Sequence, residues 1–138
     1  MIRRAIAMLG LGVAVTSAIA CRSEGPFRAG QTWIGKYICG QGPTDLTLKI
    51  VSAKRGKLEA LFDFAHAGSE TQAIFKLSGR YDSKTRAVEL EPEDWVGSHP
   101  PRWEMVGLSG TVSPDGLHFS GAITHANCTG FSLSVSGR

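Results

Sequence analysis

Long apolar runs are scarce in this chain of 138 residues. A membrane-spanning helix needs about 20 consecutive apolar residues. The longest apolar stretch, residues 5–15, is shorter than that and is interrupted by Gly10 and Gly12. The sequence therefore disfavours a retained membrane helix. No Pro/Ser/Gly-rich linker divides the rest of the chain, so we expect one domain.

Motifs for metal binding and catalysis are also missing. The histidines His66, His99, His118 and His125 show neither His-x-x-x-His nor His-Glu-x-x-His spacing, which argues against a zinc site. The serines follow no Gly-x-Ser-x-Gly pattern, which argues against a serine nucleophile of that type. We therefore expect no metal, no cofactor and no catalytic residue, and the chain is not expected to be an enzyme.

A large excess of positive charge is missing as well. The 15 Lys and Arg outnumber the 12 Asp and Glu, but Arg3 and Arg4 fall in the N-terminal leader and leave 13 against 12. No basic stripe is visible along the sequence. Because nucleic-acid binding requires cations that neutralise phosphates, we do not expect nucleic acid as the main partner.

The chain does have a leader typical of exported proteins. Arg3 and Arg4 precede the apolar stretch, and small residues follow it, so we expect a signal peptide over residues 1–20. Ala18-Ile19-Ala20 has the small-x-small form of a general cleavage site, which would release a soluble secreted protein. Together with Cys21 it also resembles a bacterial lipobox. We favour lipidation of Cys21 and a location in the periplasm or outer membrane.

The cysteine count agrees with lipidation. Three cysteines in an exported chain leave one over after pairing. If Cys21 carries lipid, Cys39 and Cys128 can form a disulfide, which an oxidising compartment permits. The alternative is that both are buried thiols. We expect residues 21–31 to be a flexible tether and residues 32–138 to form the domain.

From Thr32 onward the sequence indicates one strand after another. Apolar residues alternate with polar ones, as a strand with one buried face requires. Turn sequences such as Pro114-Asp115-Gly116 separate these segments. The expected strands cover residues 32–39, 44–53, 57–66, 73–81, 85–91, 103–112, 117–125 and 131–136.

Even spacing and short turns predict an all-β fold, an antiparallel meander of about eight strands. In that arrangement the end of the first strand and the beginning of the eighth lie at the same rim. Cys39 and Cys128 occupy these two positions. A bridge there would close the sheet into a small β-barrel without exposed edges. A two-sheet β-sandwich also satisfies the bridge and is the alternative.

Several short motifs resemble an uncharacterised family of small bacterial exported β-domains. The motifs are Tyr37-Ile38-Cys39-Gly40-Gln41-Gly42, Leu77-Ser78-Gly79-Arg80-Tyr81-Asp82, Leu90-Glu91-Pro92 with Trp95, and Cys128-Thr129-Gly130-Phe131-Ser132-Leu133. The resemblance covers residues 33–133. It implies a bacterial envelope or secreted setting and supplies no catalytic residues.

The segment 91–103 breaks the rhythm of short turns, and long loops in compact domains are disproportionately functional. The candidate binding-loop residues are Glu91, Glu93, Asp94, Trp95, His99, Arg102 and Trp103. Trp and Arg are favoured where partners are bound. The alternative, of equal weight, is that the two tryptophans plug one end of the barrel.

Two functions agree with these features. The first is an envelope-tethered module that binds a protein partner of unknown identity through its rim loops, as an inhibitor or immunity-type factor, an analogy at the level of fold. The second is a carrier that holds a small apolar ligand inside the barrel. The interior phenylalanines argue against a roomy cavity, so we favour the binding module; they are Phe62, Phe64, Phe75, Phe119 and Phe131.

Overall fold

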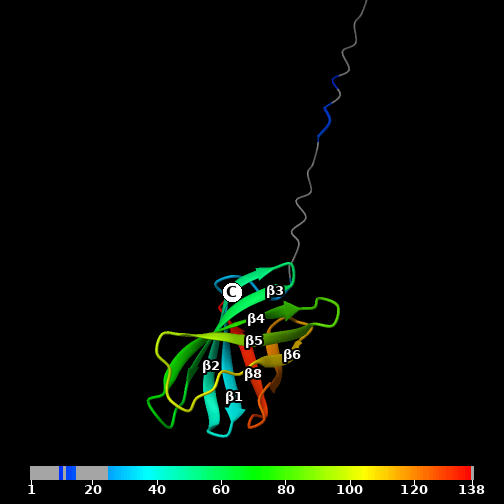
Figure 1. The fold of residues 1–138 in the computed structure, drawn as a ribbon. Helices are drawn as coiled ribbons and strands as arrows, with labels where there is room; N and C mark the ends of the chain where they lie inside the picture. Colours follow the sequence, from blue (N-terminus) through cyan, green and yellow to red (C-terminus); the bar gives the residue numbers. More distant parts are fainter. Residues whose placement is uncertain (1–9, 11, 15–24, 138) are drawn as a thin grey trace, which may run out of the picture.

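The computed structural model describes residues 10, 12–14 and 25–137, and its strands form a single antiparallel meander. The strands are β1 (Thr32–Cys39), β2 (Gly42–Lys54), β3 (Lys57–Ala65), β4 (Gln72–Tyr81), β5 (Ala87–Val96), β6 (Leu108–Val112), β7 (His118–Ile123) and β8 (Gly130–Ser136). Because β1 also pairs with β8, the sheet closes into a barrel (Figure 1). The predicted eight-stranded barrel is confirmed, and the sandwich alternative is wrong. In the described part of the chain, no helix is long and apolar enough to cross a membrane.

The seam between β1 and β8 closes the barrel. The two strands pair antiparallel as far as Ile38 and Gly130. The Thr129 N–H then donates a hydrogen bond of 2.9 Å to the Ile38 carbonyl. The predicted Cys39–Cys128 disulfide is present directly beyond this pair and joins positions separated by 89 residues. It therefore fixes one end of the seam covalently.

The turns divide between the two ends of the barrel. The end that carries the disulfide, here called the disulfide rim, contains the β1–β2 turn, the β3–β4 loop, the β5–β6 loop and the β7–β8 turn. The opposite end, the entry rim, contains residues 25–31 and the β2–β3, β4–β5 and β6–β7 turns. In Figure 1 the β1–β2 turn is at the bottom, whereas the β2–β3 turn and the C-terminus are at the top.

Side chains fill the interior of the barrel. All six phenylalanines are buried, and inward-facing aliphatic residues of the strands complete the core. Phe62 stacks on Phe75 with ring centroids 4.4 Å apart, and Phe119 meets Phe131 edge-on at 4.7 Å. Such aromatic pairs add stability beyond the area that they bury. The expectation that phenylalanines fill the barrel is confirmed.

Glycines allow neighbouring strands to approach closely. A Cβ atom at Gly79 would collide with the backbone carbonyl of Glu89 on β5. One at Gly35 would collide with the carbonyl of Ser132 across the β1–β8 seam. Glycine within a strand commonly marks such a close approach or a bend. These positions let a sheet of eight strands bend tightly enough to close.

The segment expected to be one long loop is divided between a strand and a shorter loop. β5 continues to Val96, and the loop covers residues 97–107. The strand expected from Trp103 begins only at Leu108. A register shift next to Pro92 marks a β-bulge in the β4–β5 pair. Proline is tolerated in sheets at such bulges, which explains how β5 continues past it.

The residues just before β1 fold over the entry rim. Phe27 is only 3 % exposed and packs against the rings of Trp33, Tyr81 and Phe119. The tether prediction is therefore wrong for residues 25–31, because an aromatic side chain in this segment joins the core. The rest of that prediction, with Cys21 and most of the predicted signal peptide, lies outside the described residues.

Hydrogen bonds hold this segment in place. The Gln31 side-chain oxygen accepts from Nε1 of Trp33 at 2.9 Å, and its amide donates to the Pro26 carbonyl at 3.1 Å. The Gly30 N–H donates to the Ile50 carbonyl at 2.8 Å. Residues 26–31 therefore belong to the barrel, and they determine the end from which the chain enters it.

We expect Phe27→Ala to lower the free energy of unfolding by about 3–5 kcal/mol, because it leaves a cavity among three aromatic rings. Urea unfolding monitored by tryptophan fluorescence measures the change. Ile34→Ala is the control, since Ile34 is 49 % exposed on the outer wall; its effect should stay near 0.5 kcal/mol or less. Equal effects of the two substitutions would contradict the role of Phe27 as a core residue.

Removing the disulfide should lower the free energy of unfolding by about 3–5 kcal/mol, because the bond closes most of the chain into a loop. The test compares the Cys39→Ala/Cys128→Ala variant with the oxidised protein in thermal and urea unfolding. Cys21→Ser keeps the bond and is the matched control. Unchanged stability of the double variant would show that the seam does not depend on the covalent link.

Candidate functional site

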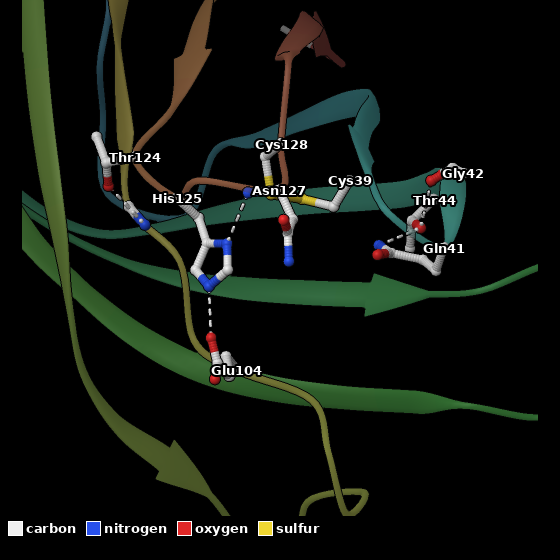
Figure 2. The surroundings of a disulfide bond; sticks show 10 residues. Cys39, Gln41, Gly42, Thr44, Glu104, Thr124, His125, Asn127 and Cys128 are labelled. Carbon is white, nitrogen blue, oxygen red and sulfur yellow. Dashed lines mark hydrogen bonds and ion pairs between the residues drawn. A yellow bond between two sulfur atoms is a disulfide. The ribbon is translucent and has the colours of Figure 1, made fainter.

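A hollow of about 400 Å³ opens at the disulfide rim. Its lining comes from β1 and three of the connections at that rim: Tyr37, Cys39, Gly40, Gln41, Arg102, Trp103, Glu104, Val106, His125, Asn127 and Cys128. Figure 2 shows the disulfide with the polar side chains that surround it. Hydrogen-bonding side chains of several kinds gather here around an apolar floor.

The β1–β2 turn forms one wall of the hollow. The Gln41 side-chain amide donates to the hydroxyl of Thr44 at 2.9 Å, and that hydroxyl donates to the Gly42 carbonyl at 3.2 Å. Nε2 of His66 lies 3.0 Å from the Gln41 carbonyl. Because a carbonyl can only accept, Nε2 carries the ring proton in this contact. The β3–β4 loop therefore supports the turn beside the disulfide.

The β7–β8 turn forms the opposite wall. The Asn127 backbone N–H donates to Nδ1 of His125 at 3.2 Å, and Nε2 of the same ring contacts the Glu104 carboxylate. Both contacts are drawn in Figure 2. In the neutral ring, Nδ1 must accept, so Nε2 carries the proton and donates to Glu104. The pair links the β7–β8 turn to the β5–β6 loop.

The β5–β6 loop closes the remaining side. Trp103 stacks on the core residue Phe64 with ring centroids 5.0 Å apart. Arg102, next to it, is exposed and has a φ of 68°, a left-handed backbone conformation that is uncommon for residues other than glycine. Strained conformations of this kind concentrate at functional sites. The partly buried tryptophan fixes the loop, and the exposed arginine lines the opening of the hollow.

The floor of the hollow is apolar apart from one phenol. Tyr37 is 3 % exposed and packs edge-on against Phe62. Burial raises the pKa of the Tyr37 phenol well above its ordinary value, and the Thr44 hydroxyl lowers it by less. The phenol therefore stays protonated and remains a neutral hydrogen-bonding group at the base of the hollow.

The structure separates the predicted binding-loop residues into two groups. Arg102 and Trp103 line the hollow together with Cys39 and Cys128. The others do not line it and lie on strand β5 or near the beginning of the β5–β6 loop: Glu91, Glu93, Asp94, Trp95 and His99. The sequence prediction therefore found one part of the site and assigned to it residues that belong elsewhere.

The second group has structural contacts of its own. Trp95 packs edge-on against Phe75 with centroids 5.4 Å apart, and His99 stacks on Trp95 at 4.6 Å. Glu93 accepts a hydrogen bond of 2.6 Å from the Ser78 hydroxyl. With Trp103 also on the core, both tryptophans have the packing that the plug alternative requires.

Sequence reasoning missed four polar residues of the hollow: Gln41, Glu104, His125 and Asn127. A signal was available for three of them, because they stand within three residues of Cys39 or Cys128. Once the cysteines are placed at one rim, their sequence neighbours must lie there too. Glu104 gave no such signal, because its position depends on the path of the β5–β6 loop.

The chemistry of the hollow is that of a recognition site. It presents a cation, a carboxylate, two side-chain amides and an imidazole, so it can donate and accept hydrogen bonds and pair with either charge. Within residues 25–137, no three His, Cys, Asp or Glu side chains come together as metal ligands. The arrangement suits binding through several polar contacts around an apolar floor.

Comparison of the chain with protein-family models and with curated proteins finds no match. The resemblance to exported β-domains therefore stays a prediction. The function must be argued from the geometry of the barrel and its rims.

We expect the neutral His125 ring to carry its proton on Nε2, because Nδ1 accepts from the Asn127 N–H. Long-range ¹H–¹⁵N NMR spectra at pH 9 report the tautomer directly. Glu104→Ala removes the contact at Nε2 and leaves the Nδ1 contact as a control. A ring protonated on Nδ1 in the unmodified protein would show that the turn has a different arrangement in solution.

Proposed function

We propose that this chain is an exported bacterial envelope protein, lipid-anchored through Cys21, that binds a protein partner at the disulfide rim. The partner would be restrained or neutralised by binding, as by an inhibitor or immunity-type factor. No catalytic step is proposed. The observation that carries this proposal is the hollow, where polar side chains from three connections surround an apolar floor pinned by a disulfide.

Rigidity supports a role in recognition. The disulfide, the Trp103 stack and the His125–Glu104 contact each tie a rim connection to the barrel or to another connection. A preorganised site loses little conformational entropy when a partner binds. The exposed Arg102 and Asn127 can then contact a partner without rearrangement of the loops around them.

The alternative function, a carrier for a small apolar ligand, has less support. The positions that would line an internal cavity hold packed aromatic and aliphatic side chains. A ligand of the hollow itself would meet a rim with both charged and amide groups. A small ligand of this chain is therefore expected to be polar or amphipathic and to bind at the rim.

The test is affinity capture from the envelope and secreted fractions of the source cell, with the oxidised chain 22–138 as bait. We expect a specific protein that is captured by the unmodified chain and reduced at least about tenfold by Arg102→Ala/Asn127→Ala, since interface arginines commonly contribute about 1–2 kcal/mol or more. Both residues are exposed, so the variant should fold.

Lys76→Ala/Ser120→Ala, two exposed positions on the outer wall, is the matched control and should retain the partner. Loss in the control with retention in the rim variant would place the interface on the barrel wall. No capture by the folded, oxidised protein would contradict the protein-binding function. Native mass spectrometry for a retained small molecule would then test the alternative.

A further inference from the structure

Basic side chains that are scattered along the sequence gather at the entry rim. They come from residues 25–31, the β2–β3 turn and the β4–β5 turn, and we call them the basic rim: Arg28, Lys54, Arg55, Lys57, Lys84 and Arg86. All six are exposed. No basic stripe is visible along the sequence, because these charges come from separate segments that only the fold brings to one rim.

The basic rim is poorly neutralised. Among the described residues, none of the six lies within ion-pair distance of a carboxylate. The carboxylates of the turns at this end, Asp82 and Asp115, accept hydrogen bonds from the backbone N–H groups of Lys84 and Leu117, respectively. These two carboxylates offset part of the charge, but six cations against two acids leave the rim with a net positive charge.

The strand register places like charges of this rim opposite each other, which does not favour the stability of the fold. Lys54 lies directly opposite Lys57, and Lys57 lies directly opposite Arg80 on β4. Like charges in such cross-strand pairs destabilise a sheet. The next position, Glu89 on β5, opposes Arg80 and leaves the lysines without a counterpart. An anionic surface outside the protein would supply one.

We infer that the basic rim rests against the anionic phospholipid headgroups of a membrane. The chain enters the barrel at this rim, where Phe27 plugs the end. The connections of the disulfide rim have the contrary charge balance. Among their described residues, Arg102 is the one lysine or arginine, and Glu70 and Glu104 are the acidic ones. The barrel is thus polarised along its axis, with its positive end at the N-terminal side.

The covalent geometry agrees with this orientation. Three residues lie between Cys21 and Gly25, so four steps of extended chain separate the two by at most about 14 Å. A lipid on Cys21, which is part of the proposed function, would hold the rim close to the bilayer. A chain that is less than fully extended would bring the rim toward the distance of about 8 Å over which charges act at physiological ionic strength. Single acyl chains and basic surfaces commonly act together as two membrane signals. The charge argument itself does not require the lipid.

A membrane fits these observations better than nucleic acid does. Surfaces that bind single strands place exposed aromatic rings among their cations. At the entry rim, Tyr81 packs edge-on against Phe27 and is only partly exposed. The six cations lie at the rim where the chain enters the barrel, which is where a membrane anchor would place a bilayer. Binding to phosphates of a membrane surface needs only this sequence-independent attraction.

The test measures co-sedimentation of the chain 22–138, which lacks lipid, with vesicles. All eight strands, the core and the disulfide lie within residues 25–137, so this chain contains the whole fold. Vesicles with 30 % phosphatidylglycerol in phosphatidylethanolamine should bind it at 20 mM salt, whereas phosphatidylcholine vesicles and 500 mM salt should abolish binding. Lys54→Gln/Lys57→Gln/Lys84→Gln should lower partitioning at least about tenfold.

Lys36→Gln/Lys76→Gln/Arg102→Gln removes the same charge from the wall and the disulfide rim and is the matched control; it should keep most of the binding. Circular dichroism and thermal unfolding verify that both variants fold. No vesicle binding by the unmodified chain, equal losses in both variants, or tighter binding to a single-stranded oligonucleotide than to anionic vesicles would each overturn the inference. None of these outcomes bears on partner capture at the disulfide rim, so the two proposals fail separately.

Discussion

The pairing of β1 with β8 is the constraint on which the rest of the molecule depends. Without it, the first and last strands would present unpaired backbone groups, and the sheet would have two edges open to other chains. The close approach at Gly35 permits the pairing, and the Cys39–Cys128 bond holds one end of it. Every connection is then assigned to one of two rims, and the position of each potential binding residue follows from that assignment.

The two ends of the barrel have different physical characters. One is a hollow in which opposite charges and amides from several connections surround a neutral phenol and a disulfide. The other is sealed by Phe27 and bordered by cations without ion-pair partners among the described residues. A filled interior separates them, so the barrel serves as a spacer that presents two surfaces in opposite directions. The fold itself therefore determines that the two surfaces face in opposite directions.

Much of the fold could be predicted from the sequence because alternation and turn chemistry are local signals. The strand around Leu58 to Phe64 alternates without interruption, and the structure has it there. Phe27 could not be assigned, because a single aromatic residue in a polar segment has no period. The extension of β5 past Pro92 depends on a bulge formed with β4, which is a tertiary effect. Of the residues that line the hollow, the sequence pointed only to the two cysteines, Arg102 and Trp103. Glu104 could not be assigned to it, because its position depends on the path of the β5–β6 loop.

A seam between the first and the last strand also determines the order of events when the protein is made. Of the eight strands, β1 is synthesised first and its second neighbour, β8, is synthesised last. Contacts so distant in sequence form slowly, because most of the chain must be ordered before they are gained. Cys39 likewise precedes its disulfide partner by 89 residues, so the native bond cannot form until Cys128 has been synthesised. The barrel can therefore close only once β8 has been made, and until then the sheet keeps edges with which other chains can pair.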